Sequence, residues 1–115
     1  MNHVLLIGYL GKDAETQTFE NGNTKTTIEV ATTERGFVTR TGQQVPDRTT
    51  WHHVVFWGGL AKMCADLKKG HRVAIQGRYE SSTFAAEDGT QRMYYCVNAT
   101  DIEFLTPKPI QDGEQ

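Results

Sequence analysis

Turn-forming pairs divide this chain of 115 residues into short segments, and this division constrains the fold more than any other feature of the sequence. Asn21-Gly22 and Asp88-Gly89 are residue pairs typical of tight hairpin turns. The segments between the turns are rich in the apolar and β-branched residues that favour strands. The expected strands cover residues 3–11, 14–34 (as a hairpin), 49–57, 71–79 and 93–105.

One segment, residues 58–70, has a helical period instead. Leu60, Met63, Cys64 and Leu67 recur at spacings of three and four residues, which predicts an amphipathic helix of about three turns with these side chains inward. The order of elements is then three strands, a helix and two strands. This order predicts an all-β fold with one short helix: the OB-fold, a five-stranded antiparallel Greek-key barrel.

The last expected strand contains an irregularity. Its apolar residues fall at odd positions up to Ala99 and at even positions from Ile102 onward. An extra residue between 98 and 101, that is a β-bulge, would explain the change of parity. We expect one domain over residues 1–105, followed by a disordered tail over residues 106–115 that is rich in proline and polar residues.

Composition limits the function. No nucleophile–base pair, phosphate-binding loop or zinc-type Cys/His spacing is present, so we expect neither an enzyme nor a metal or other cofactor. Cys64 and Cys96 are far apart in sequence and are expected to be reduced thiols. The net charge of −2 leaves room for a local basic groove. The chain has no long apolar run or signal-peptide pattern, so we expect a cytoplasmic protein.

The strand over residues 51–57 has two aromatic faces. Successive side chains of a strand point to opposite sides, so Trp51, His53 and Trp57 share one face while Val54 and Phe56 share the other. We expect Val54 and Phe56 in the barrel core. The exposed indoles then offer surfaces on which unpaired bases stack, with His53 as a phosphate contact. Packing under a loop or against another protein is the alternative for the two tryptophans.

Residues 35–49 form a long polar segment, expected to be a protruding hairpin. Such loops are usually functional or disordered. Arg35, Arg40 and Arg48 would contact a nucleic-acid backbone. Phe37 is either a local anchor or a ligand contact. Lys68 and Lys69 likewise allow two interpretations, because cations are favoured at the C-terminal end of a helix whether or not nucleic acid binds there.

The first strand is apolar on both faces. Val4 and Leu6 lie on one face, and Leu5 and Ile7 on the other. A small barrel buries only one face of such a strand, so we expect the other to meet a second subunit. We assign this interface to Val4 and Leu6.

These features together resemble the bacterial-type single-stranded DNA-binding protein (SSB) family over residues 2–105. The residues that carry the resemblance are NHVLLIGYLGKDAE, IEVATTE, TTWHHVVFWG, LKKGHRVAIQGRY, DGTQR and ATDIEFL, in that order. The resemblance implies an OB-fold homotetramer, a dimer of dimers, that binds single-stranded DNA in replication, recombination and repair, as a nucleoid-associated protein. A protein-interaction OB module of the replication-restart type and an RNA-binding barrel remain the alternatives.

The resemblance also implies roles for individual residues. Trp51, Trp57 and Phe84 match or lie near the stacking aromatics of the family. His53 lies where the family often has arginine, and His52 matches a histidine of the subunit contact. Lys68 and Lys69 match a basic pair near the DNA path.

Two of the departures of the sequence from the family bear on its expected contacts. Gly36, with Phe37 beside it, replaces a loop tryptophan. The chain ends at Gln115 without the linker and acidic tip that recruit replication and repair enzymes, so we expect that recruitment to be weak or absent, as in a short form of the family.

Overall fold

The structure is a computed structural model, and it describes residues 1–106, apart from the side chain of Phe84. The expected tail over residues 106–115 lies outside this range except for Thr106. All regular elements before residue 58 are strands, and one short helix follows β6. The elements are β1 (Val4–Leu10), β2 (Glu15–Thr18), β3 (Thr24–Glu34), β4 (Phe37–Val38), β5 (Gln44–Val45), β6 (Arg48–Trp57), α1 (Gly59–Cys64), β7 (Arg72–Ala85) and β8 (Gln91–Phe104).

Five strands close into a barrel. Their order in the sheet is β1-β7-β8-β6-β3, and β3 pairs again with β1, which completes the ring. The OB-fold prediction is confirmed, with one correction: β6 and β8 run parallel, while the other pairs are antiparallel. A closed ring with an odd number of strands cannot alternate in direction throughout, so one parallel pair is unavoidable.

The barrel core follows the period-two patterns of the sequence. Inward-facing residues of β3, β6 and β7 are fully buried, as expected for Val54 and Phe56. The fully buried apolar side chains of these strands are Ile28, Val30, Val54, Phe56, Val73 and Ile75. The expected bulge is also present, because Gln76 pairs with Asp101 whereas the next residue, Gly77, pairs with Ala99. Thr100 is therefore the extra residue that reverses the parity of β8.

The helix is shorter than the sequence predicts. It ends at Cys64, and its buried residues are Ala61 and Cys64, whereas Met63 is 56% exposed. Leu67 is buried as expected, but in the turn after the helix, where its carbonyl accepts a hydrogen bond from the Ala14 N–H at 2.9 Å. The chain thus leaves the helix early to place Leu67 under the loop that follows β1.

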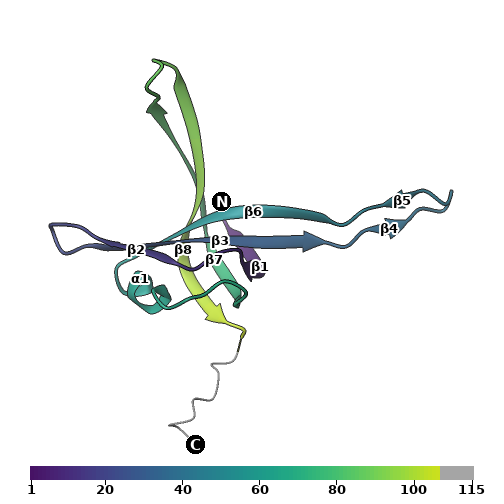
Figure 1. Cartoon of the computed structure of the whole chain (residues 1–115), viewed down its shortest axis with the longest axis horizontal. Coiled ribbons are helices and arrows are strands. Elements are labelled where there is room, and N and C mark those ends of the chain that lie inside the picture. Colours follow the sequence, from purple (N-terminus) through teal and green to yellow (C-terminus); the bar gives the residue numbers. More distant parts are fainter. Residues whose placement is uncertain (107–115) are drawn as a thin grey trace, which may run out of the picture.

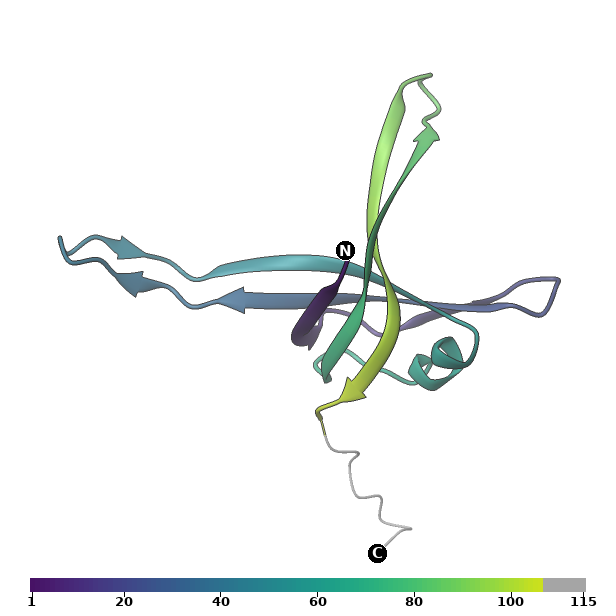
Figure 2. The ribbon, with the colours of Figure 1, turned by 180° about the vertical axis from the view of Figure 1, so that it is seen from behind.

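Three hairpins project from the barrel in different directions, and the extents of the molecule are 59 × 57 × 30 Å (Figure 1). One is formed by β2 and β3, and another by the outer halves of β7 and β8. The third contains the small β4–β5 ladder beyond the ends of β3 and β6, and Figure 2 shows it from behind. The prediction of a protruding hairpin over residues 35–49 is confirmed.

The structure reverses the expected roles of the two faces of β1. Leu6 is 8% exposed and lies in the core, and Val4 packs against that core. The assignment of the subunit interface to Val4 and Leu6 was therefore wrong. The exposed apolar face of this strand carries Leu5, Ile7 and Tyr9. Both faces are apolar, and it is the pairing of Leu6 with Ile75 that turns Leu6 inward.

Within residues 1–106, no helix is long and apolar enough to cross a membrane. Both cysteines are free thiols, Cys64 buried and Cys96 half-buried. Burial raises the pKa of Cys64 to about 12. Burial, followed by the nearby Glu80 carboxylate, also raises the pKa of Cys96. Neither thiol is activated as a nucleophile, because both are held in the protonated form.

Candidate nucleic-acid interface

The outward face of β6 carries the two tryptophans, as the sequence predicts. Trp51 is 60% exposed and Trp57 is 44% exposed, while Val55 between them is buried. β3 lies beside this row, and its residues Ala31, Glu29 and Lys25 are the direct partners of Trp51, His53 and Trp57. These six residues and their immediate neighbours form the β3–β6 face, an aromatic surface with charged residues interspersed.

Trp51 lies against the end of the loop that follows β1. A Cβ atom added at Gly11 would be 2.1 Å from Cζ3 of Trp51, so the ring covers this glycine closely. Gly11 is held in place by a backbone hydrogen bond from its N–H to the Glu29 carbonyl at 3.0 Å. The absence of a side chain at residue 11 thus allows the indole to lie on the barrel with its other face open.

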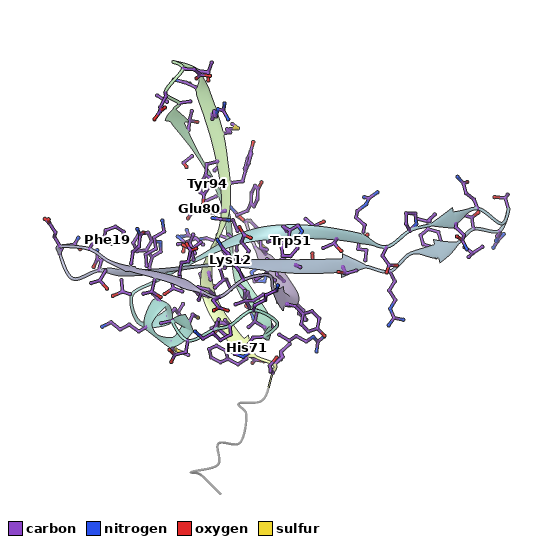
Figure 3. The ribbon with its side chains drawn as sticks, viewed as in Figure 1. Lys12, Phe19, Trp51, His71, Glu80 and Tyr94 are labelled. Atoms are coloured by element: carbon purple, nitrogen blue, oxygen red, sulfur yellow. The ribbon has the colours of Figure 1, made fainter. Side chains whose placement is uncertain are left out.

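Trp57 has two partners that sequence reasoning did not identify. The ring of Phe19, which follows β2 in the β2–β3 hairpin, stacks beside it with centroids 6.1 Å apart and planes 25° apart. Phe19 is labelled in Figure 3. The Lys25 ammonium lies 5.6 Å from the Trp57 ring centroid. This separation is within the range of a cation–π interaction. An aromatic residue next to the Asn-Gly turn was the available signal for Phe19, because the hairpin folds it back toward β6.

His53 lies between the tryptophans and contacts two other strands. Its Nδ1 is 3.7 Å from the Glu29 carboxylate on β3. The ring of Tyr94 on β8 meets it edge-on, with centroids 5.6 Å apart. Desolvation of the Tyr94 hydroxyl, followed by the nearby Cys96, raises the pKa of Tyr94, so the hydroxyl remains a neutral donor. Tyr94 is a second residue of the site that the sequence analysis missed.

His52 points away from this face, as alternation along the strand requires. Its Nε2 is 2.8 Å from the Thr32 hydroxyl. Burial lowers its pKa, so the neutral ring is favoured. The two adjacent histidines therefore have separate environments. Among residues 1–106 no group of three or more His, Cys, Asp or Glu side chains has a metal-binding arrangement.

The other expected contact residues are distributed over the projecting segments. Arg35 follows β3, Phe37 is 61% exposed on β4, and Arg40 is exposed in the turn between β4 and β5. All three lie in the hairpin beyond the Trp51 end of the β3–β6 face, into which both strands continue (Figure 1). The backbone of Phe84 lies in the outer part of β7, where it pairs with Arg92, and its side chain is outside the described part of the structure.

Lys68 and Lys69 lie in the turn before β7, four and five residues after the end of α1. The two lysines are too far from Cys64 to stabilise the end of the helix, because the effect of the helix dipole is confined to the last turn. Instead both contact Asp13. The backbone N–H of Lys69 donates a hydrogen bond to Oδ1 of Asp13 at 2.9 Å. The side-chain ammonium of Lys68 lies 4.0 Å from Oδ2 of the same residue. The lysines are thus positioned beside the same loop that contains Gly11.

Comparison with known proteins places the chain in a family. The model of the Single-strand binding protein family matches residues 1–105. A single-stranded DNA-binding protein from Bacteroides thetaiotaomicron is 31% identical over 114 residues, which are 98% of this chain and 71% of the relative. Its counterpart from Neisseria meningitidis is 37% identical over 106 residues, 91% of this chain and 60% of the relative.

Solved structures agree with the fold. A Plasmodium falciparum SSB in complex with ssDNA has a TM-score of 0.82 at 24% identity, over 92% of this chain and 96% of that one. A deletion mutant of the single-stranded DNA binding protein from Thermus aquaticus has a TM-score of 0.78 at 27% identity, over 92% of this chain and 51% of that one. The chain belongs to the Single-strand binding protein family.

Proposed function

We propose that this protein binds single-stranded DNA without sequence preference and protects it during replication, recombination and repair. The observation that carries the proposal is the pair of exposed indoles, Trp51 and Trp57, on one face of the barrel. The relatives are named single-stranded DNA-binding proteins, which supports the same function. Binding needs no chemical step, because stacking and charge neutralisation supply the free energy.

The spacing of the aromatics fits an extended strand of unpaired nucleotides. Residues 51 and 57 of a β-strand lie about 20 Å apart, so each indole takes a different base. An aromatic–base stack is worth about 1–3 kcal/mol and is available to every base, since each base has a π-face. Lys25 beside Trp57 and Arg35 and Arg40 beyond Trp51 supply cations at the two ends of the face. His53 and Tyr94 lie between the two indoles and supply hydrogen-bonding groups at the centre of the face.

Oligomerisation is part of the proposal. Leu5, Ile7 and Tyr9 are 59%, 49% and 55% exposed on the outer face of β1. Exposed apolar residues in such a row favour a subunit contact. We infer a homotetramer, a dimer of dimers, that uses this face together with His52. Replacing Ile7 by Glu is expected to lower the molar mass measured by light scattering, while Lys62→Glu on α1 leaves it unchanged. A wild-type chain that is monomeric at micromolar concentration contradicts this part.

We further infer a nucleoid-associated location in the cytoplasm. The expectation about recruitment through the C-terminus falls on residues 107–115, which lie outside the described part of the structure.

The decisive experiment uses a variant in which both Trp51 and Trp57 are replaced by Ala. Its affinity for a fluorescein-labelled oligo-dT, measured by anisotropy, should fall by at least tenfold, because two stacks are lost. Light scattering should show an unchanged oligomer. If oligo-dT binding is normal and a protein partner is lost instead, the chain is a protein-interaction OB module. Preference for oligo-U over oligo-dT in competition would point to RNA.

A further inference from the structure

A carboxylate lies in the middle of the face that we propose for DNA. Glu29 on β3 is the direct partner of His53 on β6, two residues along each strand from the Ala31–Trp51 pair. Its side chain is 36% exposed, so it reaches the surface that a bound strand would cover. A negative charge at this position is unexpected in a site for a polyanion.

Glu29 faces a lysine and a histidine of the same surface. Its Oε1 is 3.7 Å from Nδ1 of His53 and 4.0 Å from Nζ of Lys12 (Lys12 is labelled in Figure 3). Lys12 also donates a hydrogen bond to Glu15 on β2 at 3.3 Å. His53 and Lys12 come from β6 and from the loop after β1, so Glu29 connects groups on two elements.

The geometry of these contacts makes them exchangeable. At 3.7 and 4.0 Å the oxygen is beyond ordinary hydrogen-bond reach of both nitrogens. Ion pairs of this kind between partly exposed side chains contribute little to stability and are screened by salt. A DNA phosphate, which is also an anion with acceptor oxygens, can therefore take the place of the carboxylate on either group.

We propose that Glu29 is an affinity-limiting counter-charge: it holds Lys12 and His53 in the free protein and gives them up to DNA phosphates. Binding at the centre of the face is then an exchange of one anion for another. A cation that is already paired with Glu29 releases fewer counterions when it binds a phosphate than an unpaired cation does. Both the affinity for DNA and its salt dependence are therefore lower than the number of cations on the face suggests. This inference rests on the proposed function.

The test is the substitution Glu29→Gln, which removes the charge and retains the shape. Anisotropy with labelled oligo-dT at 20 and 200 mM NaCl should show about three- to tenfold tighter binding by the variant at the lower salt, and a smaller gain at the higher salt. The slope of log K against log [NaCl] should be steeper by about 0.7, the value for the one cation, Lys12, that the carboxylate no longer pairs. Circular dichroism confirms that both proteins are folded.

Two controls separate this mechanism from a general effect of charge. Asp66→Asn, at a residue after α1, makes the same change in net charge and should leave the affinity within about twofold. In the background Lys12→Met/His53→Gln, the gain from Glu29→Gln should disappear, because the groups that Glu29 holds are gone.

Unchanged or weaker binding by Glu29→Gln overturns the inference, as does an equal gain from Asp66→Asn or a gain that persists in the double-variant background. The inference and the proposed function fail differently. If wild-type protein does not bind oligo-dT at 20 mM NaCl, the proposed function is contradicted and this inference with it. If wild-type protein binds and Glu29→Gln shows no gain, only the role of Glu29 is wrong.

Discussion

Trp51 covers Gly11 so closely that a Cβ atom at residue 11 would lie 2.1 Å from the indole Cζ3. The backbone of Gly11 does not have a positive φ, so another residue could adopt its conformation. The requirement for glycine therefore comes from the ring alone. This contact links the loop after β1 to the orientation of the main stacking residue.

Gly11→Ala is expected to displace Trp51 while the barrel stays folded. The ring is exposed and free to move outward, so the free energy of unfolding should change by less than about 1 kcal/mol. Oligo-dT affinity should fall by about five- to a hundredfold, the value of one stack. Gly59→Ala is the matched control, because an added Cβ there meets no atom within 4 Å. Equal affinity for Gly11→Ala and wild type would mean that this orientation of Trp51 is not needed.

Phe19→Ala tests the residue that the structure adds at the Trp57 end of the face. Loss of the neighbouring ring leaves Trp57 more exposed, so its fluorescence emission should shift to longer wavelength. DNA affinity should fall by about two- to tenfold, the value of one aromatic contact. Phe19→Tyr retains the ring and should behave like wild type. An unchanged emission spectrum for Phe19→Ala would contradict the stacked arrangement.

Thr26 is fully buried, and its hydroxyl donates to the Ala61 carbonyl at 2.7 Å and lies 3.0 Å from the Thr16 hydroxyl. Thr26→Val keeps the shape but leaves that carbonyl without its donor. The free energy of unfolding in urea should fall by about 1–3 kcal/mol. Thr26→Ser retains the hydroxyl and should lose less. A valine variant as stable as wild type would show that this hydrogen bond does not hold α1 against β3.

His52 should make stability depend on pH, because burial lowers its pKa below the value in the unfolded chain. The unfolded state then binds the proton more readily, so the contribution of His52 is fully present above the ordinary pKa of about 6.5 and is lost as the pH falls through the lower folded value. At fixed protein concentration, wild type should lose more stability between pH 7.5 and 5.5 than His52→Gln does. Equal losses would contradict this assignment.

Much of the fold could be predicted because strand alternation is a local property. The parity of Val54 and Phe56 against Trp51 and Trp57 is enough to assign the core and the exposed face of β6. The change of parity after Ala99 was sufficient to place the bulge. Each of these inferences needed only the residues of one strand.

The errors concern features that distant contacts determine. Both faces of β1 are apolar, so only the pairing of Leu6 with Ile75 shows which one enters the barrel. The helix ends early because the carbonyl of Leu67 accepts a hydrogen bond from the backbone N–H of Ala14, a residue more than fifty positions away. Tyr94 joins the site because β8 passes beside β6, which no periodicity reveals.

DNA binding on the β3–β6 face is tested by titrating the full chain with unlabelled oligo-dT and following the intrinsic tryptophan fluorescence at two salt concentrations. Trp51 and Trp57 are the only tryptophans, so the signal comes from the proposed face itself. We predict strong quenching that saturates, with an affinity that falls as salt rises, because bases stack on the indoles and phosphates release counterions. Fluorescence that does not change, with no complex detected at low salt, would show that this face does not bind single-stranded DNA.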